Sequence, residues 1–500
     1  MKTKYIWLLA VLLSFTACNN DDDSSSTVDN LPPLTAGEAD FSNYVAVGAS
    51  FSAGFSDGAL FIATQENSFP NIMSKKFEML GGGSFSQPLM NDNIGGFVMG
   101  GTVVANPRLY FDGSGPVVLP ATPTTQITDH LSGSFNNYGI PGAKSFHLGI
   151  PGYASLNPYF GRMASSPTAT VIGDAVAQNP TFFTLSEIGG NDVLSYATSG
   201  GTGVDQTGNL NPATYGVNDI TDPNVFAASF SAAVDALTAN GAKGVVTNVP
   251  YITSLAHFTT VPYNPVPLDA GTAAVVNNAY AAYNAGVAQA FAYLVGIGAV
   301  SQADADAEIA KRTIMFEASE SNAVVIMDED LTDLTAINPQ LVSMRQATAD
   351  DLLVLPASSF IGTEAVPGNP LTVNGVAIPL ADKWVLTPEE QQAIKTATDA
   401  YNVTIESIAN ANGLAMVDFK SILIEASTTG IASGNYILNT SLVTGGLISL
   451  DGVHLTSRGY AVMANEMMRA IDATYGSNFE ASGNFVDCGD YPTNYSPSLQ

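Results

Sequence analysis

Residues 44–58 read YVAVGASFSAGFSDG, and the first half of this stretch predicts the fold class. Tyr44–Val47 is a short apolar run with two valines, which is typical of a strand buried inside a parallel sheet. A glycine follows, and the chain from Phe51 onward can start a helix. We therefore expect a buried strand that turns directly into a helix, as in sheets whose strands alternate with helices.

Similar apolar runs recur along the chain, and helical patterns lie between them. The further predicted strands are Thr181–Leu185, Gly244–Val249, Val324–Met327 and Leu414–Phe419. The predicted helices are Phe226–Ala239, Thr272–Leu294, a helix that Thr387 and Pro388 open and that runs to about Ala411, and Ser457–Tyr475. This alternation predicts an α/β fold with a doubly wound parallel sheet.

The N-terminus has the pattern of an export signal. Lys2 and Lys4 precede an apolar run, Tyr5–Ala17, that is too short to span a bilayer and fits the core of a signal peptide. The order resembles a bacterial lipoprotein signal, which implies cleavage after residue 17 and a lipid on Cys18. Residues 18–40 are polar and then contain proline, which suits a flexible tether. We expect an exported protein that is lipid-anchored at the outer membrane or the cell surface.

The rest of the chain is predicted to form one large domain with insertions. In a chain of 500 residues, we expect an α/β domain over residues 41–475 and a polar C-terminal tail over residues 476–500. Residues 60–135 are rich in glycine and proline, and residues 301–386 combine one short helix with long irregular stretches. Loops this long are uncommon unless they are functional or structured internally. We therefore expect both segments to be insertions that decorate the domain.

Composition argues against a nucleic-acid partner, a disulfide-bonded framework and a cysteine–histidine metal site. Acidic residues outnumber basic ones by 45 to 16, giving a net charge of −29, whereas a nucleic-acid partner requires clustered lysine and arginine. The chain has two cysteines, and with Cys18 lipidated Cys488 has no disulfide partner. The four histidines are far apart in the sequence and form no metal-binding motif. We expect neither a metal nor an organic cofactor, and the sequence indicates no oligomeric state.

Two serines of the opening stretch are candidate nucleophiles. Ser50 stands at the carboxyl end of a predicted parallel strand, where ligands and reactive groups collect in open sheets. It also stands beside a helix N-terminus, whose N–H groups favour developing negative charge. Ser56 matches the G-x-S-x-G nucleophile elbow by letter, but it lies well past the strand from which such an elbow must turn. Strand adjacency therefore favours Ser50.

Three later segments carry groups that could serve such a serine. In SLDGVHLTSRGY, Asp451 stands three residues before His454, close enough for its carboxylate to orient the imidazole as a base. Asn191, in GGND after a predicted strand, can aim a side-chain amide at a carbonyl oxygen, and Gly142, in GIPGA, can aim a backbone N–H. Taken alone, the Asp-x-x-His pattern fits a capped loop with a solvated histidine better than a catalytic pair.

Together these segments resemble the SGNH/GDSL hydrolase family over residues 43–475, apart from the insertions. The matching blocks, in the family's order, are Gly48-Ala49-Ser50-Phe51, Gly142 in GIPGA, Gly189-x-Asn191-Asp192 and Asp451-x-x-His454. The resemblance implies a three-layer α/β/α fold of the flavodoxin-like kind. It also implies a catalytic triad of Ser50, His454 and Asp451, and an oxyanion hole formed by Ser50, Gly142 and Asn191. The implied activity is that of a serine esterase or acylhydrolase, which cleaves carboxylic esters through an acyl-enzyme.

Two positions depart from the family pattern. Ala49 stands in place of an aspartate that usually organises the loop beside the nucleophile, and Phe51 stands in place of leucine. Two alternatives remain open. One is an α/β-hydrolase with Ser56 as nucleophile, which leaves GGND and GIPGA unexplained. The other is a surface lipoprotein that binds glycan or peptide on a retired hydrolase scaffold. The sequence does not specify the ester, since lipid esters, acetylated sugars, aryl esters and thioesters are all compatible.

Overall fold

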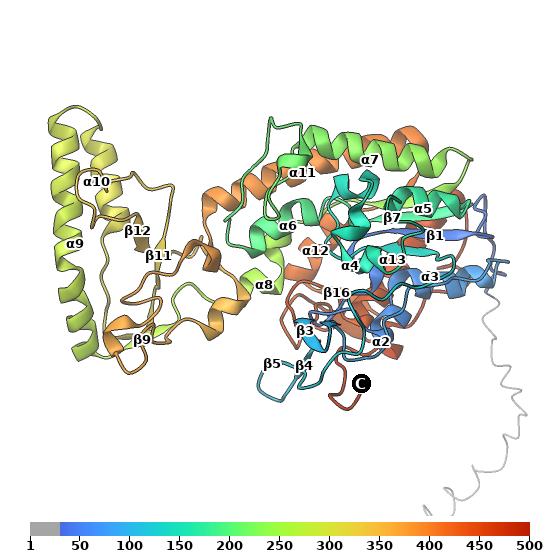
Figure 1. Cartoon of the computed structure of the whole chain (residues 1–500), viewed down its shortest axis with the longest axis horizontal. Coiled ribbons are helices and arrows are strands. Elements are labelled where there is room, and N and C mark those ends of the chain that lie inside the picture. The colour runs from blue at the N-terminus through green and yellow to red at the C-terminus, as the bar shows by residue number, and fades with distance from the viewer. Residues whose placement is uncertain (1–30) are drawn as a thin grey trace, which may run out of the picture.

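The computed structural model describes residues 31–500, and its centre is a parallel sheet of five strands (Figure 1). The strands are β1 (Tyr44–Gly48), β6 (Asn137–Gly139), β7 (Phe182–Ser186), β8 (Lys243–Thr247) and β15 (Ala415–Val417). Their order across the sheet is β15-β8-β7-β1-β6. Counted along the chain this is the order 2-1-3-4-5 of flavodoxin-like doubly wound sheets. The predicted α/β class with a parallel sheet is confirmed. The predicted signal peptide and Cys18 lie outside the described residues.

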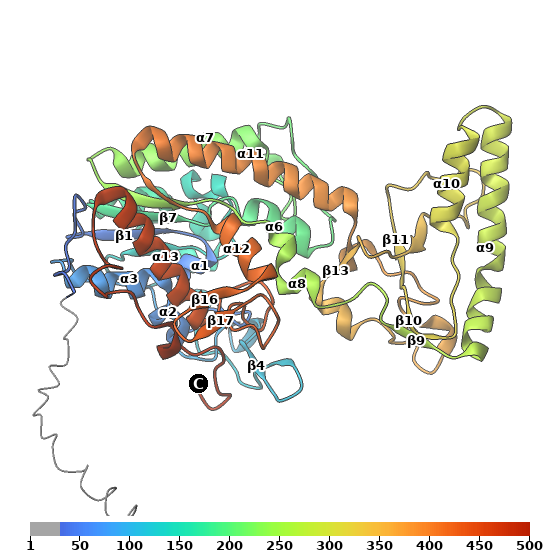
Figure 2. The same ribbon diagram turned by 180° about the vertical axis from the view of Figure 1, so that it is seen from behind.

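Helices cover both faces of the sheet, as Figures 1 and 2 show from opposite sides. One face carries α5 (Val171–Ala177), α7 (Pro223–Thr238) and α11 (Pro388–Asn412), and the other carries α3 (Phe69–Glu78) and α13 (Ser457–Tyr475). Because both faces are covered, every residue of β1 and β7 is buried. This burial explains why the strands read as continuous apolar runs rather than as alternating patterns.

The helix boundaries follow the capping residues. Thr387 and Glu390 form a reciprocal capping box at the start of α11, in which Glu390 Oε2 accepts the Thr387 N–H at 2.7 Å. Helix α13 has the predicted bounds and ends at Gly476, which adopts the left-handed conformation at φ +71°. The shorter elements of this body are α1 (Ser50–Ala53), α2 (Ile62–Glu66), α4 (Pro158–Gly161), α6 (Asn191–Thr198), α8 (Ala256–Thr259), α12 (Phe419–Thr428), β16 (Ile431–Ser433) and β17 (Tyr436–Leu438).

The insertion at residues 60–135 has internal structure of its own. It contains α2, the whole of α3, and two hairpins, β2 (Phe97–Met99) with β3 (Thr102–Ala105) and β4 (Leu109–Phe111) with β5 (Pro116–Val118). The buried Arg108 joins it to the C-terminus, because its guanidinium donates to the carbonyls of Ser496 at 2.7 Å and Leu499 at 3.0 Å. The segment is therefore packed on the domain.

A second lobe stands apart from the sheet and is coloured from yellow to orange in Figure 1. It contains α9 (Ala270–Gly296), α10 (Gln302–Arg312), β9 (Val266–Leu268), β10 (Ser319–Asn322), β11 (Val325–Met327), β12 (Met344–Gln346), β13 (Leu352–Leu353) and β14 (Val385–Leu386). The prediction that Val324–Met327 belongs to the parallel sheet is wrong, because β11 pairs antiparallel with β12 inside this lobe. The predicted insertion at residues 301–386 is also too short, since α9 belongs to the same lobe.

Both predicted flexible ends are in part docked on the domain. In the predicted tether 18–40, the Thr35 N–H donates to Asn478 Oδ1 at 2.7 Å and the Glu38 N–H donates to the Tyr475 carbonyl at 2.8 Å. In the predicted tail 476–500, Phe479 is fully buried and Cys488 is a buried free thiol. Aromatic burial explains why the tail packs although its composition is polar. No helix within residues 31–500 is long and apolar enough to cross a bilayer.

Candidate active site

The sequence-predicted site residues gather at the carboxyl ends of β1 and β7. In the strand order given above, the chain reverses direction across the sheet between these two strands, and ligands in doubly wound sheets bind at such a point. Ser50 follows β1 as the first residue of α1 and is 7% exposed. Asn191 follows β7 as the first residue of α6. The two blocks, 141 positions apart by their numbers, therefore meet at one edge of the sheet.

The turn that carries Ser50 is held by a buried carboxylate. Glu187 accepts the Ala49 N–H at 2.6 Å and the Ser52 N–H at 2.9 Å, so its side chain brackets Ser50 on both sides. Burial raises the pKa of Glu187 to about 7. Close packing also requires Gly48, because a Cβ there would lie 2.1 Å from the Ser52 hydroxyl oxygen. Glu187 was not among the predicted site residues, although an acidic residue directly after a buried strand was the available signal.

The Asn191 and Gly142 segments are tied to each other. Asn191 Nδ2 donates to the carbonyl of Ala143 at 2.9 Å, next to Gly142. The carboxylate of Asp192, which is fully buried, accepts the N–H and the hydroxyl of Ser145 at 2.9 Å and 2.7 Å. These hydrogen bonds hold the GIPGA segment and the GGND segment together as one unit.

Two backbone donors at this unit are free to bind an anion. The N–H groups of Ser50 and Gly142 donate to no acceptor within residues 31–500. Gly142 has a left-handed φ of +79°, and no atom lies within 4 Å of the position that a Cβ would take. The nearby Ile140 N–H donates to the Gly48 carbonyl at 3.0 Å, which ties this loop to the end of β1. The arrangement can present N–H groups to a developing oxyanion.

Asp451 and His454 form a hydrogen-bonded pair in the loop before α13. His454 Nδ1 lies 2.8 Å from Asp451 Oδ2, which also accepts the Gly58 N–H at 2.8 Å. Asp451 Oδ1 accepts the backbone N–H groups of Val453 and His454 at 2.8 Å and 2.9 Å. Although burial acts in the opposite direction, the imidazole and these hydrogen bonds hold the pKa of Asp451 well below its usual range. An ionised Asp451 fixes the tautomer with a proton on Nδ1 and leaves Nε2 as the base.

The imidazole of His454 lies beside the Ser50 helix. Its ring centroid is 5.8 Å from that of Phe51, the residue after Ser50, and 4.5 Å from that of Phe55. Its chain neighbours Val453 and Leu455 line the same pocket as Ser50. Within residues 31–500, neither the Ser50 hydroxyl nor Nε2 of His454 makes a hydrogen bond, with each other or with another group. Hydrogen bonds between catalytic groups are often long without substrate and tighten when it binds.

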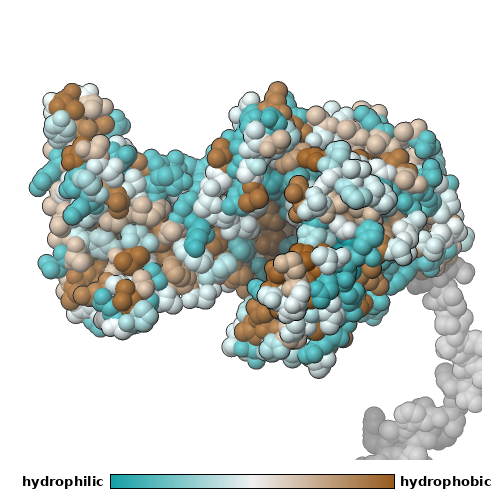
Figure 3. All heavy atoms as spheres, in the orientation of Figure 1, coloured by the Kyte–Doolittle hydropathy of each residue, from teal (hydrophilic) through white to brown (hydrophobic). Residues whose placement is uncertain are grey.

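An apolar pocket opens beside Ser50 and Asn191. It extends between α12 and α13, and Figure 3 shows a hydrophobic hollow at the place where Figure 1 draws α12. Besides Phe51, Val453 and Leu455, its apolar lining residues are Leu194, Pro250, Ile252, Leu255, Phe419, Ile422, Leu423, Ile431, Leu447, Ile448, Val462 and Met463. Walls that are lined predominantly by apolar side chains are typical of small-molecule ligand sites.

The second serine of the opening stretch is engaged elsewhere. Ser56 is buried, and its hydroxyl donates to the carbonyl of Leu455 at 2.9 Å. Next to it, burial raises the pKa of Asp57 to about 7, and the Asp57 carboxyl accepts the Leu450 N–H at 3.0 Å. Both residues fasten the Ser50 segment to the Asp451 loop. The sequence did not single out Asp57. Its hydrogen bond to Leu450 supports the loop that carries Asp451 and His454.

The comparisons with known proteins identify no relative. No family model matches the chain, and no curated protein and no solved structure matches it.

Proposed function

We propose that the protein is a serine esterase or acylhydrolase that cleaves carboxylic esters. The observation that carries this proposal is the arrangement around one pocket: Ser50 at a helix N-terminus, free N–H donors at its side, and a hydrogen-bonded Asp451–His454 pair next to Phe51. Each group supplies one of the roles that acyl transfer requires, which are nucleophile, oxyanion donor and oriented base.

In the proposed mechanism, Ser50 Oγ attacks the ester carbonyl while Nε2 of His454 takes its proton. The carbonyl oxygen becomes an oxyanion that the N–H groups of Ser50 and Gly142 and the Asn191 amide stabilise. The tetrahedral intermediate collapses as His454 returns the proton to the departing alcohol, which leaves an acyl group on Ser50. Water, deprotonated by His454, attacks this acyl-enzyme and releases the acid and the free serine.

The pocket supports an apolar acyl chain as the group that is transferred. Its walls are formed almost entirely by aliphatic and aromatic side chains, and Ser50 and Asn191 stand among the lining residues. Burial of each CH₂ group stabilises a complex by about 0.8 kcal/mol, so several methylenes in this pocket outweigh the polar contacts that a short acyl group would make. We infer that esters of medium or long acyl chains are preferred over acetyl esters.

Membership of the SGNH/GDSL family is part of the same proposal. The flavodoxin-like strand order and the meeting of the four sequence blocks support it. Ala49 lacks the side chain that usually organises the loop beside the nucleophile. Here the carboxylate of Glu187 contacts the backbone of that loop from the neighbouring strand. Export and lipid attachment at Cys18 remain proposals that rest on the N-terminal pattern.

Hydrolysis of chromogenic acyl esters by matched variants tests the activity. We expect Ser50→Ala and His454→Ala to remove nearly all activity while the circular dichroism spectrum stays that of the wild type. Ser56→Ala is the matched control, since it removes a buried hydroxyl of the same segment whose hydrogen bond is structural. Wild-type activity in the Ser50→Ala protein, or loss of activity only in the Ser56→Ala protein, would contradict the assignment.

A further inference from the structure

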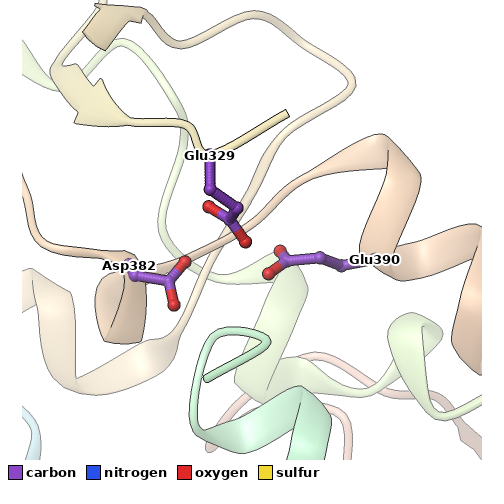
Figure 4. Close-up of side chains that lie close together, drawn as sticks. All are labelled: Glu329, Asp382 and Glu390. Carbon is purple, nitrogen blue, oxygen red and sulfur yellow. The ribbon is translucent and has the colours of Figure 1, made fainter. Parts of the chain in front are cut away.

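Three carboxylates meet where the second lobe joins the sheet-containing body. Glu329 follows β11 in the lobe, Asp382 starts the short turn η7 (Asp382–Trp384), and Glu390 lies in the first turn of α11. One carboxylate oxygen from each residue lies within 4.8 Å of those from the other two. Figure 4 shows the three side chains pointing toward one another from separate segments. The cluster lies outside the Ser50 pocket and has no part in the proposed hydrolysis.

Two of these carboxylates each have one buried oxygen that makes no hydrogen bond within residues 31–500. Glu390 is 4% exposed, and its Oε1 makes no hydrogen bond with any group of residues 31–500. Oδ1 of Asp382 is likewise buried and makes no hydrogen bond within that range. Lys311 of the lobe pairs with Asp328 and Glu389 instead, at 3.8 Å and 3.9 Å. Burying a carboxylate oxygen without a hydrogen bond or a counter-charge costs folding free energy. Each of these two unpaired oxygens therefore requires an explanation.

The carboxylate of Glu390 is held in place. Its other oxygen, Oε2, accepts the Thr387 N–H of the capping box at 2.7 Å. On the opposite side, the backbone of Gly201 packs so closely that a Cβ there would lie 1.6 Å from Glu390 Oε1. A Cβ at Gly200 would lie 2.3 Å from the carbonyl of Asp382. Any side chain at Gly200 or Gly201, just after α6, would collide with Asp382 or Glu390. The two glycines therefore pack directly against the cluster on one side.

The same lobe contains a buried acidic pair that is fully compensated. Asp328 and Asp351 both form ion pairs with Arg345, the latter at 2.7 Å. In the three-carboxylate cluster, by contrast, none of the three side chains forms an ion pair with a lysine, arginine or histidine among residues 31–500, and Lys311 pairs with neighbouring acids instead. Arg345 thus neutralises one group of buried acids, whereas the adjacent three-carboxylate cluster has no positively charged partner among residues 31–500.

We propose that Glu329, Asp382 and Glu390 form a binding site for Ca²⁺ at the junction between the second lobe and the sheet-containing body. Calcium binds oxygen ligands at 2.3–2.6 Å, so two oxygens on one ion lie at most about 5.2 Å apart, and the three carboxylates meet this limit without rearrangement. Carboxylates in an irregular arrangement suit Ca²⁺ better than Mg²⁺, which demands near-octahedral geometry at shorter distances. The bound ion links residues of the lobe to α11 and fixes the lobe against the body.

Terbium luminescence tests this site directly, because Tb³⁺ replaces Ca²⁺ and emits when a nearby indole absorbs light. Trp384 lies in the same turn as Asp382, and the only other tryptophan of the chain is Trp7. After treatment with EDTA, we expect Tb³⁺ emission under tryptophan excitation, and its displacement by Ca²⁺ with a Kd on the order of 10⁻⁴ M. Trp384→Phe should abolish this emission while leaving Ca²⁺ binding in calorimetry unchanged.

Charge-neutral variants assign the ligands. Glu329→Gln removes an exposed charge and Glu390→Gln preserves the capping box, so both proteins should fold. We expect each to weaken Ca²⁺ binding at least tenfold and to lose the rise in Tm that millimolar Ca²⁺ produces in the wild type. Glu389→Gln is the matched control: it removes the same charge one residue away and should bind Ca²⁺ as the wild type does.

Three results would overturn the proposal. These are no binding of Ca²⁺ to the wild type in calorimetry, binding that Glu329→Gln and Glu390→Gln leave unchanged, and equal displacement of Tb³⁺ by Mg²⁺ and Ca²⁺. Esterase activity plays no part in these measurements, so their outcome is independent of the proposed function.

Discussion

At the residue scale, the proposed chemistry depends on backbone groups held by buried side chains. The Ser50 turn is fixed by Glu187, and the Gly142 loop is fixed by contacts from Asn191 and Asp192. Preorganised donors of this kind stabilise a transition state without reorganisation during the reaction. The sequence suggested Ser50, Asn191 and His454 because each stands in a short motif. It did not suggest Glu187, because a single acidic residue after a strand resembles any exposed acid until its partners are known.

Replacement of the oxyanion donor should lower the rate without changing the pH dependence. In the proposed mechanism, Asn191 acts on charge that develops in the transition state, and its amide does not titrate. We therefore expect Asn191→Ala to reduce kcat by about 10²–10³-fold. The shape of its kcat/KM profile against pH should match that of the wild type, because His454 is unaltered. Steady-state kinetics on one acyl ester across pH 5–9 measures both quantities. An Asn191→Ala enzyme as fast as the wild type would show that the amide does not face the reacting carbonyl.

The raised pKa of Glu187 predicts a specific dependence of stability on pH. The folded protein keeps a proton on this carboxyl up to about pH 7, whereas the unfolded chain loses it near its ordinary pKa of 4.5. The free energy of unfolding should therefore fall as the pH rises from about 4.5 to 7. Glu187→Gln should remove about 3 kcal/mol of this fall, at 1.36 kcal/mol for each unit of pKa shift.

Urea unfolding of wild type and Glu187→Gln at a series of pH values measures this difference. Glu406→Gln, an exposed position on α11, is the control and should follow the wild type. Asp57 contributes a fall of the same sign in both proteins, since burial raises its pKa as well. If Glu187→Gln retains the full pH dependence of the wild type, the carboxyl is not buried as described.

At the element scale, the strands buried on both faces were predictable and the others were not. β1, β7, β8 and the edge strand β15 lie under helices on both faces of the sheet, and their sequences are predominantly apolar. β6 escaped prediction because Asn137-Tyr138-Gly139 is short and contains two residues that are rare in strands. Val324–Met327 was misplaced because an apolar run indicates burial and does not indicate which core buries it.

Narrowing the pocket at α12 should change the preferred acyl length. Ile422 lines the pocket and is half-buried, so a larger side chain can be accommodated without disrupting the core. We expect Ile422→Trp to lower kcat/KM for octanoyl and longer esters by about tenfold or more, and to leave acetyl ester hydrolysis near the wild-type level. Ile424→Trp, at an exposed position of the same helix, is the control. Equal losses for short and long esters would show that the acyl chain does not occupy this pocket.

At the scale of the whole molecule, the sheet-containing body carries two additions with different attachments. The insertion at residues 60–135 is fastened to the C-terminal segment by Arg108, whereas the second lobe contacts the body at a narrow junction (Figure 2). The sequence predicted that both regions were insertions. It could not predict the three-carboxylate junction, because Glu329 and Glu390 are separated by 61 positions and meet only in the folded chain.

The proposed lipid anchor makes a prediction for the whole chain. Cys18→Ser should move the protein from the membrane fraction to the soluble exported fraction, because the acyl chains attached through the cysteine provide the anchor. The docking of Thr35 and Glu38 on the body places the start of any tether at the end of α13. Cell fractionation followed by an esterase assay measures the distribution. Unchanged membrane association of Cys18→Ser would contradict lipidation at that residue.

The central claim is that Ser50 becomes covalently acylated during turnover, and a fluorophosphonate probe tests it most directly. Such a probe reacts only with a serine that an adjacent base activates. Peptide mapping by mass spectrometry should place a single adduct on Ser50 in the wild type. His454→Ala should label far more slowly, and Ser56→Ala should label as the wild type does. An adduct on Ser56 or another serine, or no adduct on a protein that hydrolyses esters, would contradict the account.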